Sequence, residues 1–374
     1  MKLIFFGADA PWSELEKTGF KRRNTNLLKS FADVQLFDQV ILIHPSTRIG
    51  VAKAIFSNKS KKSKVQDVFV SGVFYEKLNG GLFNSLKRLF FKIQIWAQGI
   101  SSFNNGANIL FCYWPKGYLL NKKVALKGRI FFDTDHNIIH DENLKKEQSR
   151  HQINVLLDAG NRSELIISSA RSMLNWYKEN GFLNLYRLRN GIDPSRFPES
   201  IVTKKNPAPI IGYIGTLSKW IDFSVYEELI QRNPQWDFHI YGSSFKDENY
   251  RNLEKYVNVS FKGFVEAGSV PDVIKSFDVA LNLYRNESWL DVDSMKIYEY
   301  LASGVPVVSM NYHPNLQEDF ENLIFTADSV NEIETVILEI LSGKKPNPDA
   351  REFIRENSWD KRVEEFYYTV LKRN

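Results

Sequence analysis

Short runs of apolar residues recur along the whole chain, with stretches of helical periodicity between them. In the first half, the runs lie at 3–6, 39–44, 68–73, 108–113, 130–133, 165–168 and 185–189. In the second half, they lie at 210–214, 237–241, 257–261, 279–283, 305–309 and 324–325. Runs of this length are typical of strands buried on both faces of a parallel sheet, which helices connect. The pattern therefore predicts an α/β protein with two doubly wound parallel sheets.

The two groups of strands predict two domains. Between them lies PESIVTKKNPAP at 198–209, which is rich in proline and charge and is typical of a linker. We therefore predict an N-terminal domain at 1–197 and a C-terminal domain at 210–357. A last helical pattern follows at 358–374. A chain of 374 residues provides enough material for two cores of ordinary size.

The segment SMKIYEYLASGVPVV at 294–308 predicts a helix followed by a buried strand. Asp293 or Ser294 can cap the helix, Ile297 and Leu301 recur at helical spacing, and Gly304 ends it. The N–H groups and the positive dipole end of such a helix bind anions, most often phosphate.

Two charged side chains of this helix admit two interpretations. Glu299, one turn inside, could accept hydrogen bonds from ribose hydroxyls above a bound phosphate. Alternatively, the segment is an amphipathic surface helix on which Lys296 and Glu299 form an i,i+3 ion pair.

The composition is that of a soluble globular protein, with 43% hydrophobic and 25% charged residues. The single cysteine, Cys112, excludes an intramolecular disulfide and fits a reducing compartment. No stretch approaches the roughly 20 apolar residues of a membrane span, and the N-terminal apolar run is too short for a signal peptide. We therefore expect a cytoplasmic protein, peripheral on the inner face of the cell membrane.

The positive charge is concentrated in one region. Residues 39–132 carry fifteen Lys or Arg and two acids, and 77–132 contain no acid at all. The bases alternate with aromatic residues, so the 48–129 region predicts contact with an anionic membrane surface. In the alternative interpretation, the apolar residues of its helix form a core face, namely Leu82, Leu86, Leu89, Phe90 and Ile93. No nucleic-acid-binding motif accompanies the charge, so we expect no nucleic acid partner.

Three motifs occur together in one order: RLRNGIDPSRF at 187–197, IIGYIGTLSKWIDF at 210–223 and KIYEYLASGVPVVS at 296–309. This set resembles the retaining, GT-B-fold glycosyltransferases of glycosyltransferase family four (group 1). The resemblance is closer to bacterial polysaccharide and teichuronic-acid type members, which carry a W-x-D after the first C-terminal strand. It covers the C-terminal half and patches of the N-terminal half.

The resemblance implies two Rossmann-like domains facing a cleft, with the acceptor held by the N-terminal domain and the nucleotide by the C-terminal one. The segment at 358–374 would cross back to the N-terminal domain. The implied activity is hexosyl transfer from a UDP- or GDP-sugar to a saccharide or lipid-linked saccharide acceptor, as in bacterial capsule or exopolysaccharide biosynthesis. The donor would be a co-substrate, with no cofactor and no metal, since no Asp-x-Asp follows a strand of the C-terminal half.

The motifs also imply donor-binding residues, which are Gly215, Thr216, Lys219, Tyr241, Gly242, Phe264, Arg285, Ser294, Met295, Lys296 and Glu299. Family members usually present an Arg and a Lys just after the first C-terminal strand, but here only Lys219 is available. Arg285 and Lys296 are the expected substitutes. The first of the family's two carboxylates is replaced by the shorter Asp291, which we expect to contact the transferred sugar.

On the N-terminal side, the resemblance implies that His136, directly after a buried strand, faces the donor sugar. Asp135 is the second catalytic candidate, as a base for the acceptor hydroxyl; the alternative for His136 is a structural histidine. Gly19, Arg22 and Arg23 are expected to border the acceptor or the diphosphate. Two further functions stay open: a non-catalytic nucleotide-sugar or glycan-binding relative, and a sugar-nucleotide 2-epimerase. A dinucleotide dehydrogenase is disfavoured because no G-x-G-x-x-G follows a strand.

Overall fold

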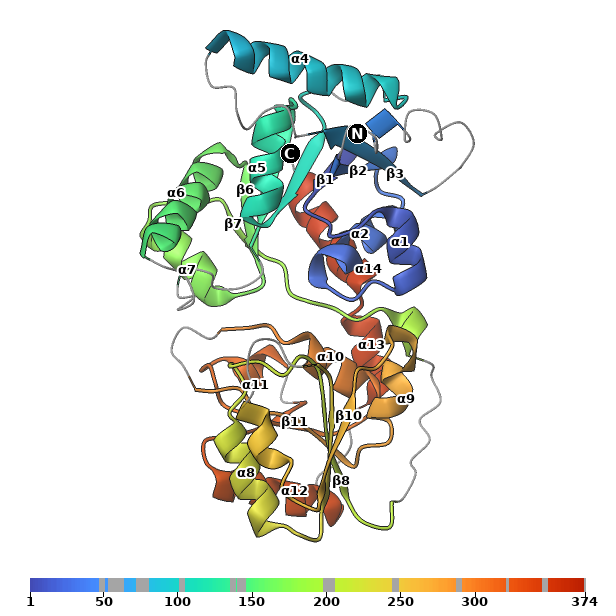
Figure 1. The fold of residues 1–374 in the computed structure, drawn as a ribbon, viewed down its shortest axis with the longest axis vertical. Helices are drawn as coiled ribbons and strands as arrows, with labels where there is room; N and C mark the ends of the chain where they lie inside the picture. Colours follow the sequence, from blue (N-terminus) through green and yellow to red (C-terminus); the bar gives the residue numbers. More distant parts are fainter. Residues whose placement is uncertain are drawn as a thin grey trace. The chain divides into compact units, whose positions relative to one another are not determined.

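The computed structural model describes residues 1–46, 51–52, 64–71, 81–100, 105–134, 139, 146–197, 206–243, 249–286, 291–320, 323–344 and 349–372. The chain divides into two compact units, Met1–Arg189 with Arg362–Asn374, and Asn190–Lys361. Figure 1 shows each unit as a sheet with helices packed on it. The boundary falls before the expected linker, of which 198–205 lie outside the described residues.

The N-terminal unit is built on a parallel sheet of seven strands in the order β3-β2-β1-β4-β5-β6-β7. The strands are β1 (Lys2–Phe6), β2 (Gln39–Ser46), β3 (Val65–Ser71), β4 (Ile109–Tyr113), β5 (Arg129–Asp133), β6 (Leu165–Ser168) and β7 (Leu185–Arg187). Its helices are α1 (Trp12–Thr18), α2 (Arg23–Asp33), α4 (Gly81–Ala97), α5 (Trp114–Val124), α6 (Lys146–Arg162) and α7 (Arg171–Glu179). All seven predicted strands are present, with ends shifted by a few residues.

The C-terminal unit repeats this plan with a parallel sheet of six strands in the order β10-β9-β8-β11-β12-β13. The strands are β8 (Ile210–Ile214), β9 (Asp237–Tyr241), β10 (Val259–Gly263), β11 (Val279–Asn282), β12 (Val307–Met310) and β13 (Phe325–Ala327). The α-helices are α8 (Phe223–Arg232), α9 (Val270–Ile274), α10 (Met295–Ala302), α11 (Leu316–Asp319), α12 (Val330–Leu341) and α13 (Ala350–Glu356). Short 3-10 turns lie at η1 (Pro194–Arg196), η2 (Asn249–Leu253) and η3 (Ala267–Ser269). Helix α14 (Trp359–Phe366) begins in this unit and enters the N-terminal unit at Arg362, and a π-helical turn follows it there at η4 (Tyr367–Leu371). The six predicted strands are again present.

The strand order of each sheet reverses at one point, between β1 and β4 in the first and between β8 and β11 in the second. The carboxyl ends of the strands leave a crevice at such a point, because the connections on its two sides run in opposite directions. Ligands of doubly wound sheets bind there. The loops after β8 and β11 are therefore where a ligand of the C-terminal unit is expected.

The end of the chain belongs to the N-terminal unit, from Arg362 onward. Phe366 packs there against Phe31, Phe131 and Tyr186, with ring centroids 6.3, 5.9 and 5.4 Å away. These aromatic contacts fix the last helical turns to the first sheet.

Helix α4 differs from the core-face interpretation. Four of the predicted core residues are exposed, namely Leu86, Leu89, Phe90 and Ile93. The helix instead buries Phe91, Gln94 and Ile95, and Gln98 just after its end is also buried. That interpretation was therefore wrong. Within the described residues, no helix combines the length and hydropathy needed to cross a membrane.

Candidate functional site

The N-terminus of α10 lies directly after β11, at the reversal point of the second sheet. Ser294 occupies the cap position, but within the described residues its side chain does not cap the helix; its hydroxyl lies 3.4 Å from Asn282 Oδ1. Helix N-termini leave their first N–H groups without an intrahelical partner. The start of α10 thus keeps backbone N–H groups that can donate hydrogen bonds to a bound anion.

Asp293, the other predicted cap, holds the 187–197 motif against α10. Its carboxylate accepts from the Asn190 backbone N–H at 2.6 Å and from the Tyr298 hydroxyl at 3.0 Å. The Asn190 side-chain amide donates to the Asp293 carbonyl at 2.5 Å. All of these groups are buried, so the network fixes where α10 begins.

Two glycines bring the backbone after β8 and the backbone after β9 into contact. A side chain at Gly242 (φ +140°) would place its Cβ 1.8 Å from the carbonyl oxygen of Gly215. At Gly215 (φ +150°), a Cβ would lie 2.7 Å from Cδ of Lys296. Both positions therefore require glycine. The structure brings together three predicted donor residues, Gly215, Gly242 and Lys296, in one small region.

Aromatic rings hold the Lys296 ammonium in place. Its Nζ donates to the Tyr284 hydroxyl and lies 4.5 and 5.5 Å from the ring centroids of Tyr284 and Tyr213. An ammonium at these distances from aromatic rings is attracted to their faces by cation–π interaction. Lys296 thus provides a fixed positive charge beside the N-terminus of α10.

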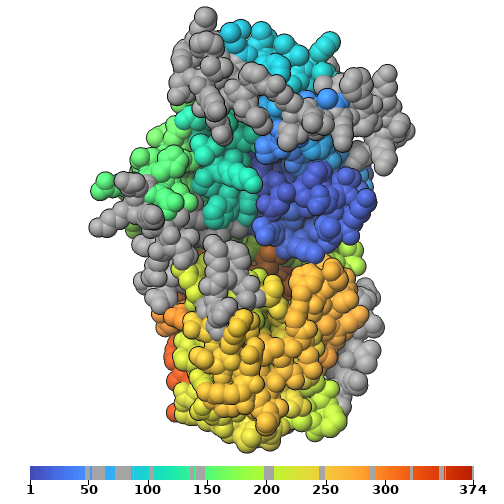
Figure 2. Space-filling model, viewed as in Figure 1, coloured from blue at the N-terminus to red at the C-terminus, as the bar shows by residue number. Residues whose placement is uncertain are grey.

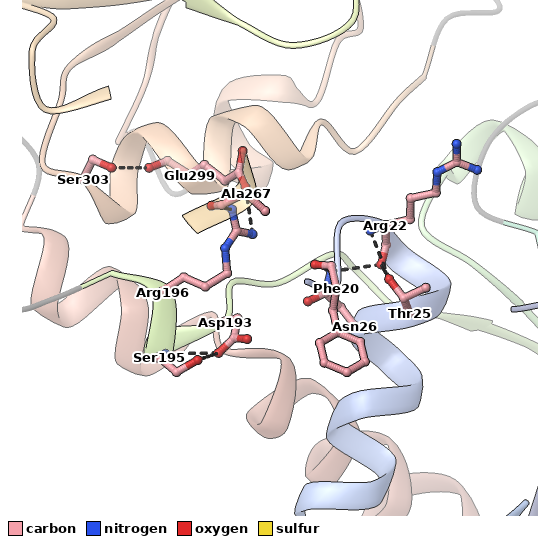
Figure 3. Close-up of polar contacts among 10 residues, drawn as sticks. All are labelled: Phe20, Arg22, Thr25, Asn26, Asp193, Ser195, Arg196, Ala267, Glu299 and Ser303. Carbon is pink, nitrogen blue, oxygen red and sulfur yellow. Dashed lines mark hydrogen bonds and ion pairs between the residues drawn. The ribbon is translucent and has the colours of Figure 1, made fainter. Parts of the chain in front are cut away.

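Glu299 pairs with Arg196, a residue that the sequence did not single out (Figure 3). The Arg196 Nη1 and Glu299 Oε1 atoms lie 3.2 Å apart, and each side chain is 18% exposed. Arg196 Nη2 also donates to the Ala267 carbonyl at 3.1 Å. Asp193 caps the η1 turn through the Ser195 N–H at 3.1 Å, which sets the position of Arg196. The surface-helix interpretation is wrong, because α10 buries five apolar or aromatic side chains and Glu299 pairs with Arg196 instead of Lys296.

Burial raises the pKa of Glu299, and the nearby charges of Arg196 and Lys296 lower it without offsetting the burial. The ionised carboxylate is therefore incompletely compensated by the protein alone. Hydrogen-bond donors from a ligand would supply what is missing. Ribose hydroxyls are donors of the required kind.

The remaining donor candidates lie in several places. Asp291 has the His313 imidazole 3.9 Å from its carboxylate, and Tyr241 packs its ring on Phe277 at 5.9 Å. Phe264 and Thr216 are exposed, and Met295 and Lys219 are partly buried.

Arg285 lies apart from the other predicted donor residues. Its Nε donates to the Ile221 carbonyl at 3.4 Å, and its side chain lines a pocket of about 360 Å³ near the start of α8. None of the other predicted donor residues lines this pocket.

The aspartate of the W-x-D motif has a local structural role. Asp222 accepts from the N–H groups of Ser224 and Val225 at 3.1 and 3.3 Å and so caps α8. Its backbone N–H donates to the Leu283 carbonyl at 2.9 Å.

In the N-terminal unit, the two predicted arginines differ. Arg23 is buried and pairs through Nε and Nη2 with Asp133, at 3.2 and 3.3 Å, which corrects the expectation that it borders a ligand. Arg22 is exposed and pairs with Asp9 at 3.2 Å, and Gly19 ends α1 (Figure 3 draws the Arg22 turn). Asp135 and His136 lie outside the described residues.

A pocket of about 590 Å³ opens at the carboxyl ends of β1 and β2, lined largely by apolar groups. Asp9 lines it, so the Arg22–Asp9 pair lies at its rim. His44 also lines it, stacks on Phe69 at 5.3 Å, and has its Nε2 atom 3.0 Å from Asp67 Oδ1, within hydrogen-bond distance. No local pattern in the sequence marks His44, because its partner comes from the next strand.

Among the described residues, no three His, Cys, Asp or Glu side chains gather closely enough to hold one metal ion.

Comparison with known sequences agrees with this arrangement of the C-terminal unit. Residues 208–343 match the family model described as Glycosyl transferases group 1. The curated protein "Putative teichuronic acid biosynthesis glycosyltransferase TuaH" of Bacillus subtilis (strain 168) is 24% identical over 136 residues, which are 34% of this chain and 34% of that protein. The chain thus spans about a third of the length of this curated relative.

Solved structures share the fold over nearly the whole chain. HepE of Anabaena, in complex with UDP and glucose, has a TM-score of 0.64 at 12% identity and covers 99% of both chains. Sucrose-phosphate synthase from Thermosynechococcus elongatus has a TM-score of 0.67 at 12% identity and covers 100% of both. A variant of S. aureus TarM bound to UDP has a TM-score of 0.59 at 12% identity, covering 100% of this chain and 98% of that one. At such identities, the likeness establishes the fold alone, two Rossmann-like domains of the GT-B type.

Proposed function

We propose that this chain, which has the GT-B fold and whose residues 208–343 match the group 1 glycosyl transferase family, moves a sugar from a nucleoside diphosphate sugar to a saccharide or lipid-linked saccharide. The observation that carries the proposal is the pairing of an uncapped α10 N-terminus with Glu299 one turn inside it. In this proposal, the first binds the diphosphate and the second accepts hydrogen bonds from the ribose hydroxyls. The UDP found in HepE and TarM complexes favours a UDP-sugar, with a GDP-sugar as the other candidate.

In the proposed reaction, the bond between the anomeric carbon and the diphosphate oxygen breaks, and its electron pair leaves with the diphosphate. A new bond forms between that carbon and the acceptor hydroxyl oxygen, on the same face of the sugar. The hydroxyl proton passes to the departing diphosphate, so the configuration is retained and no metal or cofactor takes part. Stabilising the leaving group is the main task of the protein. Lys296 and the N–H groups of α10 would perform it.

Glu299 would accept hydrogen bonds from the ribose hydroxyls, and Gly215 and Gly242 would let the backbone approach the diphosphate. Asp291 would contact the transferred sugar beside His313. On the acceptor side, the 590 Å³ pocket of the N-terminal unit, with Arg22 at its rim, offers an apolar site for a saccharide or its lipid carrier. The proposed location is the cytoplasmic face of the membrane, where lipid-linked acceptors are presented.

A thermal-shift panel of UDP-, GDP-, ADP- and CMP-sugars against wild type, Glu299→Ala and the control Glu318→Ala tests the proposal. Glu318 is an exposed glutamate of the same unit, so its replacement should change nothing. One nucleotide at about 100 times its dissociation constant should add nearly 3 kcal/mol to the stability of wild type and the control, but much less to Glu299→Ala. Donor hydrolysis should accompany it. No shift with any nucleotide would sink the assignment of Glu299.

The non-catalytic alternative rests on two observations, the absence of an arginine after β8, where only Lys219 is available, and the shorter Asp291 at the position of the family's first carboxylate. Under that alternative, the same nucleotide stabilises the protein but no acceptor or water ever cleaves it. Turnover measured with saccharide and lipid-linked acceptors separates the two functions.

A further inference from the structure

Helix α4 carries apolar side chains on two opposite faces. Its inner face packs on β3 and α5 of the N-terminal unit, where Phe91 and Ile95 are buried. Its other face carries Leu86, Leu89, Phe90, Ile93 and Trp96, which we call the outer stripe and which are between 47% and 66% exposed. Figure 2 shows α4 in cyan at the surface of this unit.

The outer stripe follows the spacing i, i+3, i+4, i+7 and i+10, so its members lie on one continuous side of the helix. Soluble proteins rarely expose a contiguous patch of large apolar side chains unless something binds it. The exposed Leu183 and Val257, by contrast, stand singly elsewhere in the chain.

The charge beside the stripe selects the kind of partner. Arg88 is exposed and Lys92 partly exposed on the same helix, both on one flank of the stripe. Lys116, Lys122 and Lys123 of the neighbouring α5 are also exposed. No acid occurs anywhere from 77 to 132. An apolar stripe flanked by Arg88 and Lys92, on a helix without acids, matches a surface that is apolar inside and negative outside.

We propose that the outer stripe is a docking surface for an anionic lipid bilayer. Helix α4 lies in the plane of the interface, with the stripe among the upper acyl carbons and Arg88 and Lys92 at the level of the headgroups. A second copy of the chain fits less well, because it would bring Arg88 and Lys92 of one copy close to those of the other. The inference deepens the proposed membrane partner, yet the docking itself needs no nucleotide sugar, so it stands or falls separately from the proposed function.

The experiment is sedimentation of the full chain with phosphatidylcholine vesicles containing 30% phosphatidylglycerol, for wild type, Leu89→Gln/Ile93→Gln and the control Leu183→Gln. The double variant replaces two exposed side chains and should fold normally, which its nucleotide-induced thermal shift or its circular dichroism verifies. We expect its partition coefficient to fall at least tenfold and that of the control to stay unchanged. Arg88→Ala/Lys92→Ala should reduce binding about fivefold per charge, and only on anionic vesicles.

A second measurement places the helix in the bilayer directly. Lipids brominated near the headgroup should quench tryptophan fluorescence in wild type, and most of that quenching should vanish in Trp96→Phe. Equal vesicle binding by wild type and Leu89→Gln/Ile93→Gln would overturn the proposal. So would a dimer in light scattering that the same double variant converts to monomer, since a second copy would then cover the stripe.

Discussion

Two arginine–carboxylate pairs, Arg23–Asp133 in the N-terminal unit and Arg196–Glu299 in the C-terminal unit, differ in their access to solvent. In the N-terminal unit, Arg23 and Asp133 are 2% and 0% exposed and make two hydrogen bonds to each other. In the C-terminal unit, Arg196 and Glu299 are each 18% exposed and meet at one contact of 3.2 Å. A sealed pair can only support the fold, whereas an open pair can exchange partners with a ligand.

In the open pair, the nearby positive charges do not fully offset the burial of the Glu299 carboxylate. The pKa of Glu299 is raised because burial outweighs the attraction of Arg196 and Lys296. A carboxylate in this state gains more from a ligand's hydroxyl donors than one that is already saturated. The comparison therefore leads us to expect a structural role for Arg23–Asp133 and, under the proposed function, a binding role for Arg196–Glu299.

The largest expected effect comes from breaking the sealed pair. Arg23→Met leaves the Asp133 carboxylate buried without its counter-charge, and we expect the free energy of unfolding of the N-terminal unit to fall by about 3–5 kcal/mol. Urea unfolding followed by circular dichroism measures it. The double variant Arg23→Met/Asp133→Leu should recover much of the loss, because no charge is then left unpaired. A loss below about 1 kcal/mol in the single variant would put the two pairs in the same class.

Breaking the open pair should act on binding more than on stability. Arg196→Met should cost roughly 1 kcal/mol of stability but reduce nucleotide-sugar affinity about tenfold, the loss expected for a hydrogen bond to a charged group. Removing its positive charge raises the pKa of Glu299 further, so the carboxylate is ionised only at higher pH. Calorimetric titrations between pH 5.5 and 8 should therefore show binding lost at higher pH than in wild type as the solution is acidified. Arg196→Lys, which keeps the positive charge, should restore part of the affinity and part of the wild-type pH profile.

A pH profile identical to that of wild type would contradict this assignment, because Arg196 would then act only as a structural support. So would a loss of stability as large as that of Arg23→Met.

The sequence predicted the sheets well and the pairs poorly, for one physical reason. Buried parallel strands are nearly continuous apolar runs, so Leu3, Ile211 and their neighbours mark the strands locally. Arg196 and Glu299 lie far apart along the chain, and the network of Asn190 with Asp293 helps to bring their segments together. No local pattern contains that information. The sequence likewise could not predict the uncapped start of α10. Ser and Asp are common N-cap residues, but here the side chains of Ser294 and Asp293 contact Asn282 and Tyr298 instead.

Helix α4 illustrates the same limit for packing. Phe91 and Ile95 on one side, and Leu89 and Ile93 on the other, both recur at helical spacing. Periodicity shows that apolar faces exist but does not show which one the sheet covers. The inner face was settled only by the contacts of α4 with β3 and α5.

The smallest expected effect concerns a third carboxylate, more open than either pair. Asp158 joins α5 to α6, is 33% exposed, and accepts from Lys122 at 2.6 Å, Tyr118 at 2.8 Å and Arg162 at 3.0 Å. Burial alone would raise its pKa, but these three hydrogen bonds together lower it to about 2. Solvent screening keeps the gain small, so Asp158→Asn should lose only about 0.5–1 kcal/mol at pH 7.

Because the folded pKa of Asp158 is depressed, its contribution is complete above the ordinary value of 3.8 and is lost as the pH falls toward about 2. Urea unfolding at pH 7, 5 and 3 should thus show that the difference in free energy of unfolding between wild type and Asp158→Asn shrinks only at the lowest pH. The exposed-site control Asp328→Asn should have the same free energy of unfolding as wild type at every pH. A gap that persists undiminished at pH 3 would mean that the variant disturbs packing between α5 and α6 instead of removing a charge. A gap above about 3 kcal/mol at pH 7 would show that exposure does not rank the carboxylates of this protein, and the distinction between its sealed and open pairs would fail with it.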